Sequence, residues 1–230
     1  GQEITGVNDF FNAFGKKVVL SSDGSTLAVY DSQISIELQA GQTLEDLYGE
    51  LAPQYFPYVQ VYQYTNGTWT QVGDNFLFDN ITAYSDMSFS GDGSTLAIAT
   101  KVGIDIYEFN GTTWVASGQQ ISVDNNVFEV SVGLSDNGEI LVVGNGYYND
   151  SNSSDDPSYE GRVAVYESLD NTWVLLGSPI IGLNYLEYFG SIVDISSDGY
   201  AIAVATAQTN GDDQVKIYEF ISANWVQKGS

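Results

Sequence analysis

Short stretches of alternating apolar and polar residues recur along the chain and predict β-strands throughout. The clearest are four copies of a phrase of the type Val-x-Val-Tyr, in which the apolar residues stand two positions apart. A period of two places successive side chains on opposite faces of a strand. We therefore expect one strand over each copy, at residues 59–62, 104–107, 163–166 and 215–218.

A tryptophan follows each of these strands, and the chain has only four tryptophans. A short polar phrase of the Asn-Gly-Thr type stands just before each one, as in Asn66-Gly67-Thr68-Trp69. Such a phrase between two apolar runs predicts a tight hairpin turn. The tryptophan is then expected on the outer strand of a hairpin, as one large ring at the same place in every copy.

A second predicted hairpin precedes each Val-x-Val-Tyr strand and is centred on Asp-Gly or Asn-Gly. The four copies cover residues 20–29, 89–98, 134–143 and 195–204. This dipeptide tolerates the positive φ angles that a two-residue hairpin turn needs. We interpret the Asp-Gly pairs as turn residues in the first place and as cation ligands only in the second.

Together these signals divide the chain into four repeats, 1–73, 74–118, 119–177 and 178–230. Each repeat is predicted to hold four antiparallel strands, which gives an all-β protein of sixteen strands. Four-stranded units of this length are typical of β-propeller blades. The predicted fold is a single-domain propeller of four four-stranded blades, and the alternative is a segment of a larger propeller or tandem array.

The repeats resemble the FG-GAP-like and WD40-like repeats of secreted β-propeller proteins. The motif is a Phe-Gly pair followed by Leu-Ser-x-Asp-Gly and an apolar strand, most complete from Phe14-Gly15 onward and from Phe189-Gly190 onward. Ala83-Tyr84 and Phe128-Glu129 stand in its place in the other two repeats. The resemblance implies a propeller fold, secretion and ligand recognition or adhesion, and it implies no enzymatic activity.

Both ends of the sequence fall at the same repeat boundary, which favours a ring closed by packing between the first and last blades. The family's Asp-x-Asp-x-Asp calcium loop is missing from all four repeats. Calcium is therefore not implied by the resemblance.

Composition excludes several classes of function. The 230 residues contain no cysteine and no histidine, so Ser-His-Asp catalysis, Cys-His catalysis and Cys- or His-based zinc sites are ruled out. Thirty acidic residues against six basic ones give a net charge of −24, which opposes binding to nucleic acids and to anionic membranes. No apolar run is long enough for a membrane span. The charge suggests a soluble protein in a cation-rich, saline setting. The resemblance to secreted propeller proteins implies an extracellular or cell-surface location.

The loop between the second and third strands of each repeat varies in length, and these loops are expected to gather on one face of a propeller. In the third repeat this loop holds the tyrosines Tyr147, Tyr148 and Tyr159, which we take as candidate ligand-binding residues. Calcium binds oxygen ligands, so the same loop is a candidate calcium site with ligands Asp150, Asn152, Asp155 and Asp156. The spacing does not match an EF-hand, and the alternative is a solvated loop without metal.

The corresponding loop of the first repeat has a helical pattern at residues 43–51, where Thr43 and Asp46 form a capping box. The aromatic residues Tyr55 and Phe56 lead from this segment back to the third strand and are further candidate ligand-binding residues. Its leucines either pack on the blade or meet a partner.

These features lead us to expect a non-enzymatic, secreted or cell-surface adhesion module that presents its variable loops to a protein or glycan ligand. One alternative is a structural repeat of a surface fibre or sheath, in which neighbouring copies are the partners. A lesser alternative is a glycoside hydrolase that uses a carboxylate pair, which needs no histidine.

Overall fold

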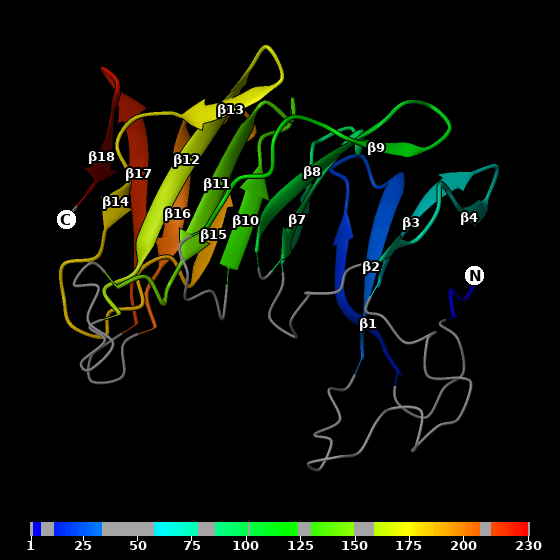
Figure 1. Cartoon of the computed structure of the whole chain (residues 1–230), viewed down its shortest axis with the longest axis horizontal. Helices are drawn as coiled ribbons and strands as arrows, with labels where there is room; N and C mark the ends of the chain where they lie inside the picture. Colours follow the sequence, from blue (N-terminus) through cyan, green and yellow to red (C-terminus); the bar gives the residue numbers. More distant parts are fainter. Residues whose placement is uncertain are drawn as a thin grey trace.

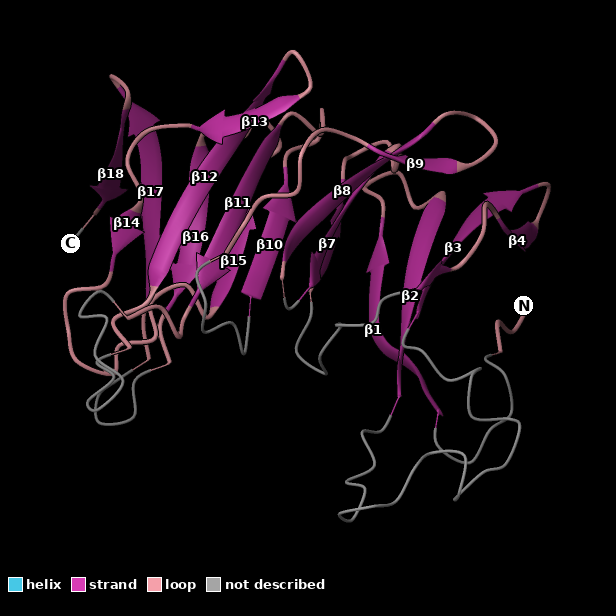
Figure 2. Cartoon of the chain, viewed as in Figure 1, coloured by secondary structure: helices cyan, strands magenta, loops and turns pink. Residues whose placement is uncertain are grey.

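The computed structural model describes residues 2–5, 12–33, 58–77, 86–100, 102–123, 130–149, 159–207 and 213–229. Within these ranges the regular structure is all strand, as Figure 2 shows. The described residues contain no helix long and apolar enough to cross a membrane. The predicted helix at 43–51 lies outside the described residues.

Sixteen strands form four antiparallel sheets, each ordered as the chain runs, which confirms the predicted fold class of four four-stranded blades. Blade 1 consists of β1 (Asn12–Leu20), β2 (Thr26–Gln33), β3 (Tyr58–Thr65) and β4 (Thr68–Gln71), and blade 2 of β6 (Met87–Phe89), β7 (Thr95–Thr100), β8 (Gly103–Phe109) and β9 (Trp114–Ala116). Blade 3 consists of β10 (Val130–Leu134), β11 (Ile140–Asn145), β12 (Arg162–Leu169) and β13 (Thr172–Leu175), and blade 4 of β15 (Ile192–Ile195), β16 (Ala201–Ala205), β17 (Val215–Ile221) and β18 (Asn224–Lys228).

Two further strands of two residues each belong to the links between blades. β5 (Phe76–Leu77) pairs with β3, and β14 (Ile180–Ile181) pairs with β12. Ile121 makes a single bridge to Ile104 at the same point of blade 2. The link that leaves each of the first three blades therefore runs back along the third strand of that blade before the next blade begins.

The four blades stand in a row that fans around their first strands, with blade 1 at one end and blade 4 at the other (Figure 1). Three hydrophobic clusters join them, one between each pair of consecutive blades. Among the described residues no such cluster joins blade 4 to blade 1. The expected closed ring is therefore not formed, and the row is open at both ends.

The alternation of side chains gives every blade two apolar faces. In blade 2, Ala97, Ile104 and Ile106 point toward blade 3, whereas Leu96 and Ile98 point toward blade 1. All five are at most 3% exposed. A blade buried on both faces needs apolar residues on both, which is why β7 has no exposed position.

The tryptophan of each later blade packs on the glycine that ends the preceding one. A Cβ atom on Gly73, Gly118 or Gly177 would lie 3.1 to 3.2 Å from the Cδ1 atom of Trp114, Trp173 or Trp225, respectively. These glycines also have φ angles between 71° and 78°, where other residues are strained. In every blade the glycine stands four residues after the tryptophan. Between neighbouring blades, the tryptophan contacts the preceding blade and the glycine contacts the following one, which confirms that the tryptophans have a structural role.

The Asp-Gly hairpins are stabilised by their own side chains. In blade 1, Ser21 donates from its hydroxyl to Asp23 at 2.7 Å, and the amide of Ser25 donates to the same carboxylate at 2.8 Å. The hydrogen bond from Ser21, followed by those from Ser25, lowers the pKa of Asp23. The same pattern holds Asp92 and Asp198 in blades 2 and 4. These carboxylates are satisfied within the turn, as expected of turn residues.

A chain of polar contacts crosses all four blades near their first strands. Lys17 of blade 1 lies 2.5 Å from Asp86, which precedes β6 of blade 2. The other carboxylate oxygen of Asp86 accepts from the Ser131 hydroxyl and the Val132 amide of blade 3, at 3.0 and 3.1 Å. Ser131 in turn accepts from the amide of Val193 in blade 4 at 3.1 Å. Asp86 is thus the junction that fixes the first three blades relative to one another.

We expect Asp86→Ala to lower the free energy of unfolding by about 1–3 kcal/mol, because the amide of Val132 and the hydroxyl of Ser131 would lose their acceptor. Urea denaturation measures the effect. Asp213→Ala, at an exposed position, is the matched control and should change stability by less than about 0.5 kcal/mol. Equal effects of the two substitutions would contradict the role of Asp86 as a junction.

Candidate functional site

Three tyrosine rings meet at one end of blades 3 and 4. Tyr147 follows β11, Tyr159 precedes β12, and Tyr188 lies between β14 and β15. The ring centroid of Tyr147 lies 5.5 Å from that of Tyr159 and 5.2 Å from that of Tyr188, and both pairs meet edge to face. The rings of Tyr159 and Tyr188 are stacked, with their centroids 5.8 Å apart. We call these three residues the tyrosine site. All three are partly exposed, so the stack can be reached from solvent.

Backbone hydrogen bonds hold the three segments of the tyrosine site side by side. The Tyr188 amide donates to the Tyr159 carbonyl at 3.1 Å, and the Phe189 amide donates to the Glu160 carbonyl at 3.0 Å. The Gly161 amide donates to the carbonyl of Tyr148, next to Tyr147, at 3.1 Å. Phe189 itself is only 1% exposed and packs in the core between blades 3 and 4. The Phe-Gly motif therefore anchors the loop that carries Tyr188.

The backbone of the tyrosine site is unusual. Tyr159, Leu186 and Tyr188 have φ angles of 44°, 54° and 49°, in the left-handed region. The other described non-glycine residues with positive φ lie in the turns between the third and fourth strands of blades, where such angles are ordinary. Non-glycine residues held in this conformation cost about 1–3 kcal/mol each, and they cluster at functional sites because packing there enforces them.

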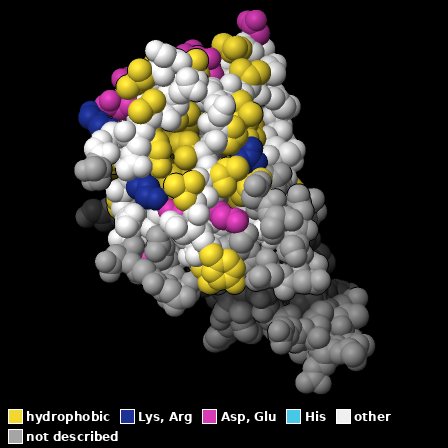
Figure 3. All heavy atoms as spheres, turned by 90° about the vertical axis from the view of Figure 1, so that its left-hand side faces the viewer, with side chains coloured by type: hydrophobic (Ala, Val, Ile, Leu, Met, Phe, Trp, Pro, Cys, Tyr) yellow, Lys and Arg dark blue, Asp and Glu magenta, His cyan; other side chains and the backbone are white. Residues whose placement is uncertain are grey.

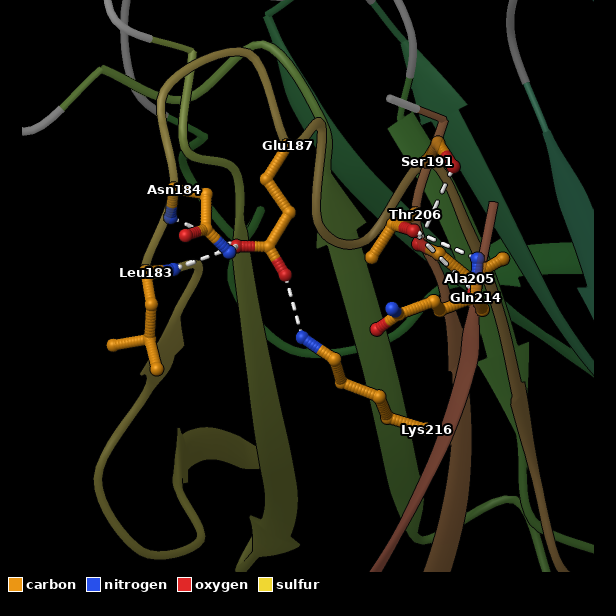
Figure 4. A network of polar contacts seen from close by, with 8 residues as sticks. All are labelled: Leu183, Asn184, Glu187, Ser191, Ala205, Thr206, Gln214 and Lys216. Atoms are coloured by element: carbon orange, nitrogen blue, oxygen red, sulfur yellow. Dashed lines mark hydrogen bonds and ion pairs between the residues drawn. The ribbon is translucent and has the colours of Figure 1, made fainter. Parts of the chain in front are cut away.

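A buried carboxylate enforces the conformation of the 183–190 loop (Figure 4). Glu187 has no exposed surface, and its Oε1 accepts from Lys216 Nζ of β17 at 2.5 Å. Its Oε2 accepts from the amides of Leu183 and Asn184 at 2.8 and 2.9 Å and from the Asn184 side chain at 3.1 Å. Both oxygens are thus satisfied, and the two strained residues Leu186 and Tyr188 flank this fixed point.

The partners of Glu187 also set its ionisation. Burial is the largest influence and would raise the pKa of Glu187, but the hydrogen bonds from Lys216, Asn184 and Leu183 outweigh it, so the pKa lies below its ordinary value. Glu187 is therefore a carboxylate at neutral pH. Because this carboxylate is fully buried and both of its oxygens accept hydrogen bonds from the protein, we assign it the role of positioning the loop.

Next to the tyrosine site, the other face of blade 3 carries a cation. The Arg162 guanidinium lies over the ring of Tyr148, 5.3 Å from its centroid. Arg162 also lines a shallow pocket between blades 2 and 3, together with Asn145 and Tyr166. The stacked arginine offers positive charge in a chain with only six basic residues.

The structure brings together part of the predicted set of site residues. Tyr147 and Tyr159 are in contact, and Tyr148 is beside them in sequence but pairs with Arg162 instead. The other predicted residues lie outside the described residues: the aromatics Tyr55 and Phe56 and the calcium ligands Asp150, Asn152, Asp155 and Asp156. Among the described residues there is no group of three acidic side chains placed to hold a metal ion, and calcium binding stays a prediction.

Sequence reasoning missed Tyr188, Glu187 and Lys216. Tyr188 stands directly before Phe189-Gly190, so its place next to the motif was the available signal. Glu187 is one of thirty acidic residues, and no local pattern marks it as buried. Lys216 occupies the polar position within the third strand of blade 4, and a basic residue at such a position is predicted to be exposed to solvent.

No protein-family model matches the chain, and no curated protein matches it in sequence. Among solved structures, it resembles hydrazine synthase from Kuenenia stuttgartiensis, with a TM-score of 0.52 and 15% identity over 98% of this chain and 51% of that one. It also resembles two proposed 6-phosphogluconolactonases, both with a TM-score of 0.54. The protein from Bacteroides uniformis is 12% identical over 92% of this chain and 52% of that one, and the protein from Bacteroides fragilis is 14% identical over 99% and 56%.

These neighbours have β-propeller folds, and at such low identity they show the fold alone. The chain spans about half the length of each of the three. They confirm the coarse part of the sequence interpretation, a propeller-like arrangement of blades. They do not show that the repeats are FG-GAP-like or WD40-like.

The comparisons correct the predicted function. We expected a non-enzymatic adhesion module, but proteins of this fold that resemble the chain include proposed lactonases. The prediction of adhesion was drawn from a family resemblance and from loop variability, and a fold shared with such proteins gives it no support. The prediction of an adhesion module is therefore wrong. The two alternatives, a fibre repeat and a glycosidase with a carboxylate pair, gain no support from the comparisons either.

Proposed function

We propose that this protein binds a small, cyclic, sugar-like molecule at the tyrosine site. The observation that carries the proposal is the stack of Tyr147, Tyr159 and Tyr188, whose rings come from three separate segments and are held partly exposed by a strained loop. Aromatic rings present apolar faces that pack on the C–H side of a sugar ring, and phenol hydroxyls form hydrogen bonds with the hydroxyl groups of the sugar. Convergent aromatic and polar groups of this kind are typical of small-molecule sites.

The nearby solved structures suggest which sugars to try. Two of them are proposed 6-phosphogluconolactonases, so lactones and acids of hexoses are the first probes for this chain. The FG-GAP-like or WD40-like character of the repeats and an extracellular setting remain part of our proposal, and they rest on the Phe-Gly motif and on the acidic composition.

Titration calorimetry with gluconolactone, gluconate and glucose tests the proposal. We expect saturable binding of at least one of them, and Tyr188→Leu should weaken it about 2- to 12-fold, because an aromatic stacking contact contributes about 0.5–1.5 kcal/mol. Tyr200→Leu removes a ring that stacks on Phe220 away from this site and should leave binding unchanged. Binding unaffected by Tyr188→Leu would contradict the proposal. Following lactone hydrolysis in the same samples separates a binding protein from an enzyme.

A further inference from the structure

The two ends of the blade row carry largely apolar faces. In blade 4 the face that points away from blade 3 includes Ile192, Ala203, Val215 and Ile217, and the strand register places one exposed carboxylate, Asp194, beside Ala203. Ile192, Val215 and Ile217 are 66%, 68% and 38% exposed. Figure 3 looks onto this end of the molecule and shows hydrophobic side chains in the middle of the face, with basic and acidic side chains among them.

The positions that Val215 and Ile217 occupy are buried in every other blade. The counterparts of Val215 are Val59, Ile104 and Val163, each 0% exposed, and all three pack against the following blade. The counterparts of Ile217 in the other blades are at most 3% exposed. Blade 4 thus presents the surface that blades 1 to 3 use to hold the blade after them.

Blade 1 presents the complementary surface. Its Val18 and Leu20 are 54% and 56% exposed, whereas their counterparts in blades 2 and 3 are at most 7% exposed and pack on the preceding blade. Trp69 and Tyr64 share this end of the molecule and line a hollow there. On β2 the same face holds Val29 and the acidic residue Asp31, which are only 3% and 2% exposed, so the open part of this face is the part formed by β1.

The tryptophan and glycine contact is also unfilled at the end of the row. Gly229 ends blade 4 with a φ angle of 85°, like Gly118 and Gly177, but no atom lies within 4 Å of the Cβ position that would be built on it. In blades 1 to 3 the equivalent glycine holds the tryptophan of the next blade. Blade 4 therefore offers a socket for a tryptophan, and among the described residues Trp69 of blade 1 contacts no such glycine.

We propose that the face of blade 4 binds the face of blade 1 of a second copy of this chain. The proposal commits to a second copy because each face continues an interface already built three times within the molecule, and the two faces are the two halves of that interface. Two such contacts, related by a two-fold axis, join two rows of four blades into a closed ring of eight. The chain spans about half the length of the propeller structures it resembles, so two copies together match that length.

One existing contact is exchanged when the pair forms. The side chain of Gln2 makes two hydrogen bonds to the backbone of Trp69, at 3.0 and 2.7 Å, as Gln119 does to Trp173 between blades 2 and 3. In the proposed pair Gly229 of the partner subunit packs against Trp69, so the two hydrogen bonds between Gln2 and the Trp69 backbone are broken. Gln2→Ala is therefore expected to leave the association intact or to strengthen it.

Light scattering coupled to size exclusion, over two decades of protein concentration, tests the proposal. We expect a species of about 50 kDa, twice the 25.0 kDa of one chain. Each copy carries a charge of −24, so raising the salt concentration should strengthen the association by screening the repulsion. A mass of 25 kDa at all concentrations and salt levels, or an open series of larger species, would overturn the proposal.

Three matched lysine substitutions identify the faces. Val215→Lys and Leu20→Lys place an ammonium group in the proposed contact and should each weaken association at least about tenfold. Both side chains are more than half exposed in the single chain, so the thermal midpoint of the dilute protein should change little. Val115→Lys, at an exposed apolar position on β9 away from both faces, is the control and should associate normally.

Mixing the two weakened variants distinguishes this arrangement from contact between like faces. Val215→Lys keeps its blade 1 face unchanged, and Leu20→Lys keeps its blade 4 face unchanged. In a mixed pair these two unchanged faces meet, so one of the two contacts is intact and both lysines lie in the other. The mixture should therefore associate more strongly than either variant alone. If mixing restores nothing, or if Leu20→Lys has no effect while Val215→Lys dissociates the pair, the head-to-tail arrangement is wrong.

Discussion

Lys216→Met is expected to lower the free energy of unfolding by about 3–5 kcal/mol, because it leaves the fully buried carboxylate of Glu187 without its counter-charge. Methionine replaces the aliphatic part of the lysine, so packing is largely kept and the effect reports the lost ion pair. Urea denaturation measures it. Blade 4 offers a matched control in Lys228, which pairs with Glu219 but is 63% exposed. Lys228→Met should cost less than about 1 kcal/mol.

Glu187→Gln provides the second variant should Lys216→Met fail to fold. The amide oxygen of glutamine can still accept from the amides of Leu183 and Asn184, and Lys216 is partly exposed and can turn to water. We therefore expect a smaller loss than for Lys216→Met. Equal and small losses for Lys216→Met and Lys228→Met would mean that Glu187 does not depend on its partner.

The same ion pair makes stability depend on pH. The pKa of Glu187 in the folded protein lies below its ordinary value of 4.5, so this contribution is fully present above about pH 4.5. It is lost as the pH falls from there through the lowered folded pKa, because in this range the unfolded state binds a proton that the folded state does not hold. Wild-type stability should thus fall on acidification more steeply than that of Glu187→Gln, which has no proton to take up at this position.

Most of the fold could be predicted because its signals are local and repeated. The Val-x-Val-Tyr strands, the Asp-Gly hairpins and the four tryptophans each report on a few neighbouring residues, and all appear four times in the same order. Asp23 and Asp198 lie in the turns expected of them. Consistency between local propensity and repeat spacing is what makes such an architecture readable from sequence.

Closure of the row could not be predicted, for a physical reason. Val215 and Ile104 stand at the same place in the same phrase, and both are apolar because each strand is built to be covered. Sequence shows which face of a blade is apolar but not what covers it. In the structure Ile104 is 0% exposed and Val215 is 68% exposed, although nothing local distinguishes them.

Only part of the tyrosine site could be predicted, for a similar reason. Tyr147 and Tyr159 come from one variable loop, so their grouping follows from sequence distance. Tyr188 and Glu187 belong to the start of the next repeat, and they reach the site only because blades 3 and 4 pack side by side. The left-handed backbone of Leu186 and Tyr188 has no sequence signature, since neither is a glycine or asparagine.

Trp173→Ala is expected to cost about 3–5 kcal/mol of unfolding free energy, the range for removing a large buried aromatic side chain. Trp173 is 7% exposed and belongs to the hydrophobic cluster between blades 2 and 3. Its ring lies against Gly118, and its backbone is held by Gln119. Alanine leaves a cavity that the flat sheets on either side cannot fill, so blades 2 and 3 lose their main contact at the outer edge.

Trp69→Ala is the matched control, because Trp69 occupies the same position of blade 1 but has no blade before it. It is partly exposed and contacts Tyr64 of its own sheet, with ring centroids 5.2 Å apart. In dilute protein, where chains are single, its replacement should cost less than about 2 kcal/mol, since less surface leaves water on folding. At concentrations where two copies associate, the same substitution should also weaken the pair, because Trp69 then fills the socket at the partner's Gly229. A loss equal to that of Trp173→Ala in the single chain would show that blade 1 is covered as fully as the inner blades, and the open row would be wrong.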